Sequence, residues 1–247
     1  MKLNKNFFKE NIKTIIYALL IAVFIRSIFF QPFYIPSSSM EPNLLVGDRL
    51  FVSKYTYGYS KHSFPFSPPI LNKRIFYSEP KYGDLIVFKT PSDNRTDFIK
   101  RLIGLPGDEI QFIDGDLYIN NNQVIKTKIK NFNAKFNCGN INSNCEAYIE
   151  KLPSGVTYVT IYNQQDTRWN DSDKYKVPKD HYFFLGDNRD NSGDSRYLGK
   201  VGYVNKLNLV GRARRIFFSS DKKKGNFFKF WKWHKSIRIG RFFNKIQ

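Results

Sequence analysis

The sequence is poor in the residues that most often bind metals or act as general bases near neutral pH. Its 247 residues include only three histidines and two cysteines. The histidines His62, His181 and His234 lie far apart, and none shares a stretch with an obvious acidic partner. These features disfavour a serine–histidine triad and a metal site built from histidine or cysteine. We expect no metal and no cofactor.

Acidic residues are also scarce relative to basic ones. The chain has 40 Lys and Arg against 21 Asp and Glu, a formal charge of +19. Such a balance indicates a negatively charged neighbour, either nucleic acid or an anionic membrane face. Residues 221–247 carry +8 of this charge and many aromatic side chains. This basic aromatic tail fits either a membrane surface or a disordered segment.

The N-terminus lacks a site at which a signal peptide would be cleaved. Lysines in residues 1–11 precede an apolar stretch, 12–31, whose main interruption is Arg26. A helix from about Ile12 to Phe30 would be roughly 28 Å long, close to a hydrocarbon core of about 30 Å. Bulky residues follow the stretch where cleavage needs small ones. A buried core helix and a cleavable signal peptide are the alternatives to the uncleaved anchor that we predict, with its lysine-rich end in the cytoplasm.

Residues 35–54 combine hydroxyl side chains with prolines. Pro36 and Pro42 exclude a helix and hold the serines between them in an extended loop. Residues 44–46 and 50–52 are predicted to form core strands joined by a turn at Gly47 and Asp48. The Ser39-Met40 pair is a candidate nucleophile, and the alternative is a polar linker behind the anchor.

A lysine interrupts one of the next apolar strands. Residues 53–80 are rich in aromatics and proline and are predicted to be irregular, and 85–88 then form a strand. In the stretch 98–103, Lys100 and Arg101 stand between Ile99 and Leu102. Lys100 either lies on the solvent face of a strand or is buried for a purpose.

Short alternating strands with Asn- and Gly-rich turns fill residues 109–178 and predict an inserted all-β subdomain. It contains Cys138 and Cys145. A metal site would need more ligands at closer spacing, so a local disulfide is expected outside the cytoplasm. Closing so short a loop would stabilise the fold by about 2 kcal/mol.

The loop 186–196 is almost wholly polar. Asn188, Asp190 and Ser192 follow the spacing of a calcium-binding loop, but Gly199 stands where the closing glutamate is needed. Calcium is therefore disfavoured. The opposing charges favour a network of turns and ion pairs that fixes one or two hydroxyls, and an ordinary surface turn is the alternative.

Four motifs occur in one order: Ile-Pro-Ser-Ser-Ser-Met-Glu-Pro, Tyr-Gly-Asp-Leu-Ile-Val-Phe, Ile-Lys-Arg-Leu-Ile-Gly-Leu-Pro-Gly-Asp and Gly-Asp-Asn-Arg-Asp-Asn-Ser-Gly-Asp-Ser-Arg. Together with the anchor they resemble the type I bacterial signal peptidases. The resemblance spans the anchor and most of residues 35–215. Ser38 stands where many members have glycine, and the tail has no counterpart among the motifs.

The resemblance implies roles for individual residues. Ser39 would be the nucleophile and Lys100 the general base, with the Ser37 hydroxyl and the Ser39 backbone N–H as oxyanion hole. Ser192 would orient Lys100. The supporting and pocket-lining residues would be Asp187, Asp194, Arg101 and Arg196 for the loop, and Ile35 and Ile99 for the substrate pockets. A dry apolar surround would make Lys100 a base, because burial lowers the pKa of lysine.

The predicted fold is mostly β. An antiparallel catalytic core, 32–108 and 179–220, carries the inserted cap, 109–178, and follows a single transmembrane helix. The protein would be a single-pass endopeptidase of the bacterial inner membrane, with its catalytic domain on the extracytoplasmic side. Its partners would be secretory preproteins and membrane lipids, with no nucleic acid and no obligate protein partner.

Two other functions are compatible with parts of the sequence. One is a different serine–lysine protease, such as a self-cleaving SOS repressor or a plasmid transfer peptidase, although self-cleavers need no membrane helix. The other is a membrane-tethered protein that binds nucleic acid through Lys223, Arg238, Trp231 and Trp233 of the tail. That function would leave the central motifs unused.

Overall fold

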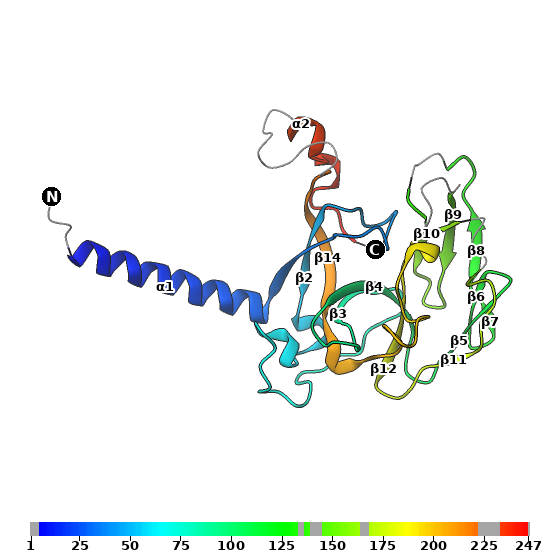
Figure 1. Ribbon diagram of the computed structural model, residues 1–247, viewed down its shortest axis with the longest axis horizontal. Coiled ribbons are helices and arrows are strands. Elements are labelled where there is room, and N and C mark those ends of the chain that lie inside the picture. Colours follow the sequence, from blue (N-terminus) through cyan, green and yellow to red (C-terminus); the bar gives the residue numbers. More distant parts are fainter. Residues whose placement is uncertain (1–4, 133–135, 139–144, 164–167, 222–232, 247) are drawn as a thin grey trace.

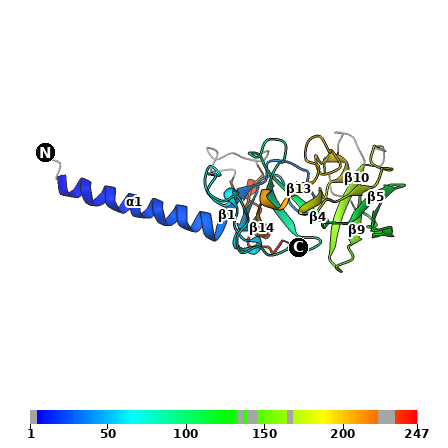
Figure 2. The same ribbon diagram turned by 90° about the horizontal axis from the view of Figure 1, so that it is seen from below.

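The computed structural model describes residues 5–132, 136–138, 145–163, 168–221 and 233–246. A long helix, α1 (Lys5–Ile28), projects from one end of a β-rich body, and the strands of residues 109–176 lie at the opposite end (Figures 1 and 2). Neighbouring strands pair antiparallel in every sheet. The predicted mostly-β, antiparallel fold with one N-terminal apolar helix is therefore confirmed.

The helix α1 exposes its apolar side chains. Its segment Phe8–Ile28 has a mean hydropathy of 1.7 and is long enough to cross a membrane. These exposed side chains argue against the alternative of a buried core helix. The helix both begins and ends earlier than predicted, because the chain enters β1 (Phe30–Tyr34) directly after it. Pro32 disfavours helical geometry at Gln31, which favours this early end.

The largest sheet has seven strands in the order β1-β2-β14-β3-β4-β12-β13. Besides β1 these are β2 (Asp48–Ser53), β3 (Leu85–Lys89), β4 (Asp97–Gly104), β12 (His181–Leu185), β13 (Val204–Asn205) and β14 (Leu209–Ser219). Two buried apolar clusters line it, one around Leu50 and Val87 and one around Phe88 and Phe184. The predicted strands at 85–88 and 98–103 both belong to this sheet.

The remaining strands form two smaller sheets, β11-β5-β6-β7 and β10-β9-β8. Their bounds are β5 (Glu109–Ile113), β6 (Asp116–Ile119), β7 (Asn122–Gln123), β8 (Ile125–Lys128), β9 (Cys145–Lys151), β10 (Thr157–Asn163) and β11 (Tyr175–Lys176). One buried cluster joins residues of these sheets, such as Phe112, to Ile103 and Phe183 of the large sheet. The sheets thus pack on the core, and cap boundaries at 109 and 178 stay an interpretation.

The prediction of a strand at residues 44–46 is wrong. These residues form a turn, in which the Leu45 N–H donates to Asp48 Oδ2 at 2.8 Å and the Asp48 N–H to the Leu45 carbonyl at 3.0 Å. Gly47 completes it with φ of 97°, and a Cβ there would stand 1.8 Å from the Ser220 carbonyl oxygen. Local hydrogen bonds to Asp48 replace the pairing that a strand would need.

Residues 53–80 contain two short 3₁₀ helices, η1 (Tyr55–Tyr57) and η2 (Lys61–Ser63), in an otherwise irregular course, as predicted. The tail contains α2 (Trp233–Ser236) and η6 (Ile239–Arg241) before it returns to β14. There the Ile216 N–H donates to the Asn244 carbonyl at 3.0 Å. Lys223 and Trp231 lie outside the described residues.

Candidate active site

The loop between β1 and β2 carries three consecutive serines, and polar groups of a second loop fix its backbone. Ser39 is buried, and its carbonyl oxygen accepts from the Asn188 N–H at 3.2 Å. The Asn188 amide also donates to the Ser38 carbonyl at 3.1 Å, and Asn191 donates to Ser38 Oγ at 2.8 Å. The backbone of the three serines is therefore fixed by these hydrogen bonds, and the segment is not a free linker.

The Lys100 side chain meets this segment from β4. It is only 3% exposed, and its Nζ is hydrogen-bonded to Ser39 Oγ. Of the two positions left open for Lys100, the buried one is correct. Burial lowers the pKa of Lys100 from 10.5 to about 8, although Asp194 and Asp187 act in the opposite direction. An amine with this pKa is partly neutral near pH 8 and can accept a proton.

Burial alone does not distinguish Lys100, because the structure buries a second lysine as well. Lys54 is equally buried, and desolvation likewise lowers its pKa to about 8. Its Nζ donates to the Ser63 carbonyl oxygen. Contact with a hydroxyl of the serine loop is therefore what distinguishes Lys100 from Lys54.

A pocket of about 410 Å³ opens beside the two side chains. Ile35 and Ile99, both predicted to line substrate pockets, are among its lining residues, together with Phe33. Ser37 also lines it, and its Oγ lies 3.4 Å from Ser39 Oγ. The cavity joins an apolar surface to the Ser39 hydroxyl, an arrangement that suits an extended peptide with small apolar side chains.

Two buried ion pairs stand behind the site. Arg101 binds Asp187 through both carboxylate oxygens at 2.8 Å, and Asn43 of the serine loop donates to the same carboxylate at 2.7 Å. Arg196 donates to Asp194 at 2.8 Å. Burial raises the pKa of Asp194, but Arg196 and the Gly186 N–H outweigh it and hold this pKa below its ordinary value.

Comparisons with known proteins give the family of the chain. A family model described as signal peptidase, peptidase S26, matches residues 8–218. The chain belongs to the peptidase S26 family of signal peptidases. The signal peptidase I of Rickettsia canadensis (strain McKiel) is 37% identical, over 95% of this chain and 92% of the relative. That of Rickettsia massiliae (strain Mtu5) is 36% identical, over 96% and 93%.

A solved structure is also similar to this family member. It is a crystal structure of a signal peptidase I from Enterococcus faecalis V583, with 26% sequence identity and a TM-score of 0.32. The match covers 55% of this chain and 97% of that one.

The predicted contact between Ser192 and Lys100 of this signal peptidase is not formed. Ser192 is buried, but its Oγ has no hydrogen-bond partner among the described residues and does not bond to Lys100. The Ser192 hydroxyl instead lies against Gly186, where a Cβ would stand only 2.2 Å from it. The same Cβ would stand 2.6 Å from the Ser39 carbonyl oxygen, so this close approach requires glycine.

Sequence reasoning missed a further buried ion pair. Glu150 of β9 and Arg189 of the short helix η3 (Arg189–Asn191) lie 2.5 Å apart, and Tyr158 and Tyr162 donate to the same carboxylate. Burial raises the pKa of Glu150, but Arg189 and the tyrosine hydroxyls outweigh it and lower the pKa overall. The pair ties the small sheets to the loop that holds Ser38. Nothing in the alternating pattern of β9 marked Glu150 as an inward residue.

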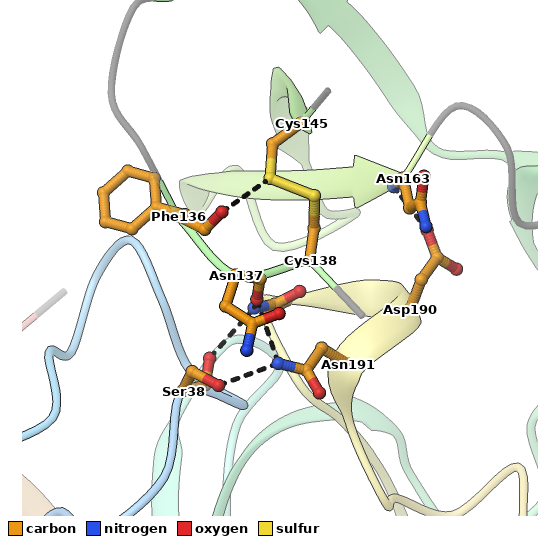
Figure 3. Close-up of a disulfide and its surroundings, with 9 residues drawn as sticks. Ser38, Phe136, Asn137, Cys138, Cys145, Asn163, Asp190 and Asn191 are labelled. Atoms are coloured by element: carbon orange, nitrogen blue, oxygen red, sulfur yellow. Dashed lines mark hydrogen bonds between the residues drawn. A yellow bond between two sulfur atoms is a disulfide. The ribbon is translucent and has the colours of Figure 1, made fainter. Parts of the chain in front are cut away.

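Cys138 and Cys145 are joined by a disulfide, as predicted. Figure 3 shows the adjoining Asn137 next to Ser38 and Asn191. The Asn137 carbonyl accepts from Asn188 at 2.7 Å and from Asn191 at 2.9 Å. The two asparagines that hold the serine loop are thus themselves held by a residue beside the disulfide.

The described histidines have other partners. His62 Nδ1 is 2.9 Å from Ser67 Oγ, and His181 Nδ1 is 2.8 Å from the Lys179 carbonyl. Neither is hydrogen-bonded to Ser39, and the side chain of His234 lies outside the described residues. Among the residues that the structure describes, no group of three or more His, Cys, Asp or Glu side chains is placed to hold a metal ion.

Proposed function

We propose that the protein is a membrane-anchored serine endopeptidase that removes N-terminal signal peptides from secretory preproteins. Ser39 is the nucleophile and Lys100 the general base. The observation that carries this proposal is the hydrogen bond between Lys100 Nζ and Ser39 Oγ inside a buried site. Membership of the signal peptidase family supports the substrate class.

The proposed proton transfers depend on the protonation state of Lys100. When Nζ is neutral, the Ser39 hydroxyl donates to it, and the oxygen gives up this proton as it attacks the scissile carbonyl. The resulting ammonium then protonates the leaving amine. Lys100, neutral again, takes a proton from the water that hydrolyses the acyl-enzyme. The depressed pKa of Lys100 makes these steps accessible near pH 8.

Charge on the carbonyl oxygen needs donors that are already in place. The Ser37 hydroxyl, 3.4 Å from Ser39 Oγ, and the Ser39 backbone N–H are our candidates. The pairs Arg101–Asp187 and Arg196–Asp194 act as positioning groups. Asp187 accepts from Asn43 of the serine loop, and Asp194 accepts from the Gly186 N–H. Ser192 has no orienting contact with Lys100 in this structure, so its role stays a prediction.

The anchor would present this site at the membrane. We propose that α1 spans the bilayer once with its lysine-rich start in the cytoplasm and the β body outside. A precursor whose signal peptide lies in the same bilayer would then reach the pocket beside Ser39 in an extended conformation. Ile35 and Ile99 would contact its small side chains.

Cleavage of a secretory preprotein by the detergent-solubilised full chain tests the proposal, with products identified by mass spectrometry. We expect the wild type to release the signal peptide and Ser39→Ala to lose activity by at least 10³-fold. Ser38→Gly is the matched control: it removes the contact with Asn191 but leaves both neighbouring hydroxyls, so its loss of activity should be severalfold at most. Wild-type cleavage by Ser39→Ala would overturn the assignment.

A further inference from the structure

A second pocket, of about 590 Å³, lies where α1 meets the β body. Most of its lining comes from α1, the η2 segment with the turn after it, and the β3–β4 hairpin, and β1 and β14 add Gln31 and Val210. The lining residues that matter here are Arg26, Lys61, His62, Phe66, Lys89 and Arg95. Its lining shares Asp97 with the pocket beside Ser39 but includes neither Ser39 nor Lys100.

The lining has more positive charge than its own acids neutralise. Arg26, Lys61 and Arg95 form no ion pair within the described part of the chain. Lys89 is paired with Asp97 at 2.9 Å. The Asp93 carboxylate accepts from two threonine hydroxyls and from the Arg95 backbone N–H. Three cations therefore line the pocket without an acidic partner among the described residues, an arrangement that attracts an anion.

His62 supplies a fixed polar group among these cations. It is only 4% exposed, and its Nε2 is buried and has no hydrogen-bond partner in the part of the chain that the structure describes. Burial and the charges of Lys61, Lys89 and Arg74 lower the pKa of His62 to about 4, so the ring is neutral at pH 7. When Nδ1 accepts from Ser67, Nε2 carries the proton and lacks only an acceptor. A buried donor without an acceptor is costly unless a ligand supplies one.

The location of the pocket indicates where the anion comes from. Arg26 lies in the last turn of α1, and Tyr59 OH donates to the carbonyl of Ile28, the final residue of that helix, at 3.0 Å. If α1 spans the bilayer, this level coincides with the lipid headgroups. Phe66, which lines the same pocket, has a fully exposed ring, and aromatic rings concentrate at that interface.

We propose that this pocket binds the phosphodiester headgroup of an anionic phospholipid. The phosphate lies among Arg26, Lys61 and Arg95, while the acyl chains lie along the exposed apolar side chains of α1. His62 Nε2, which is enclosed in this structure, would donate to the phosphate only after the ring shifts toward the cavity. A lipid is favoured over a free phosphate, because a cavity of about 590 Å³ leaves room for the glycerol backbone as well. The inference rests on the anchoring in the proposed function but not on its peptidase chemistry.

Native mass spectrometry of the detergent-solubilised full chain tests this site, with phosphatidylglycerol, phosphatidylcholine and glycerol 3-phosphate as probes. We expect retained phosphatidylglycerol and weak retention of the other two. Lys61→Gln/Arg95→Gln should weaken phosphatidylglycerol binding about ten- to thirty-fold. The control Lys151→Gln/Lys176→Gln removes the same charge from exposed positions on the small sheets and should bind as the wild type does.

Three outcomes would overturn the proposal. Equal losses in the two double variants would indicate general surface charge, and equal retention of glycerol 3-phosphate would indicate a free phosphate ester. Absence of phosphatidylglycerol from the wild type would exclude the site. Cleavage of a short soluble peptide is measured in parallel and should be unchanged in both double variants, so a failure of the lipid site is distinguishable from a failure of the peptidase assignment.

Discussion

Arg241, near the end of the chain, binds the buried carboxylate of Asp48, with Nη2 2.6 Å from Oδ2 and Nε 3.1 Å from Oδ1. The same guanidinium donates to the Asn43 carbonyl at 2.9 Å. Asn43 in turn donates to Asp187, the partner of Arg101. The tail is thus connected through two hydrogen bonds to the network behind Ser39, a connection that a purely membrane-binding or disordered tail would not have.

Replacing Arg241 should therefore destabilise the fold. Arg241→Ala leaves Asp48, which is fully buried, with Arg238 at 3.8 Å as its one cationic partner among the described residues. We expect the free energy of unfolding to fall by about 1–3 kcal/mol. Denaturant unfolding of the full chain in detergent measures this, and Lys235→Ala, an exposed change in the same tail, is the control. Equal stabilities for the two variants would contradict a docked tail.

The sequence predicts those structural features that produce a local pattern of residues, and it does not predict pairs of residues that are distant in the chain. Ser39 and Lys100 are 61 residues apart. Prolines around one and apolar neighbours around the other made them candidates, and only the motif resemblance paired them. The Arg241–Asp48 pair spans 193 residues and produces no periodic pattern. Glu150 likewise looks like any outward residue of an alternating strand until Arg189 is placed beside it.

The remaining differences have the same origin. The end of α1 and the turn at residues 44–46 depend also on the pairing of β1 with β2 and on the hydrogen bonds to Asp48, which the apolar pattern of the sequence does not report. The hydroxyl of Ser192 lies against Gly186 and makes no hydrogen bond to Lys100. Motif resemblance located these residues in the correct loop but did not fix their rotamers.

The disulfide should matter for the serine loop as well as for stability. Cys138→Ser/Cys145→Ser removes a covalent link beside Asn137, which holds Asn188 and Asn191. We expect about 2 kcal/mol lower unfolding free energy and a severalfold fall in kcat at nearly constant KM. Unfolding curves and peptide kinetics under non-reducing conditions check this. A variant with unchanged kcat would show that the asparagines hold the loop without the disulfide.

Proteolysis of intact spheroplasts tests the topology. If α1 crosses the membrane with the β body outside, added protease should degrade most of the chain after Pro36, leaving a membrane-embedded N-terminal fragment. Lysed spheroplasts provide the control, since there the N-terminal lysines also become accessible. Complete protection in the intact cells would exclude the proposed orientation.

Lys100 should lower the stability of the protein at neutral pH. Its pKa is about 8 in the folded protein and 10.5 when unperturbed, so below pH 8 the folded state holds a charge in a dry site. This cost is present below about pH 8 and disappears as the pH rises toward 10.5. We expect Lys100→Met to raise the unfolding free energy at pH 7 by roughly 1–3 kcal/mol, and less at pH 9.5. Unfolding curves at both pH values decide it, and a less stable variant at pH 7 would contradict this reasoning.

Catalysis should depend on Lys100 and not on Lys54, although burial lowers the pKa of each to about 8. Lys100→Met should abolish cleavage in a folded protein, and Lys100→Arg should fail too, because guanidinium is not deprotonated at working pH. Lys54→Met is the matched control, because Lys54 bonds to the Ser63 carbonyl and not to Ser39.

The pH profile of kcat/KM gives the second part of this test. Activity requires neutral Lys100, so in the wild type it should rise with pH through an apparent pKa near 8. Lys54→Met should keep this limb, and replacement of all three histidines should leave it in place as well. If the limb moved in Lys54→Met, or if His181→Ala alone removed cleavage while Lys100→Met kept it, the serine–lysine assignment would have to be abandoned.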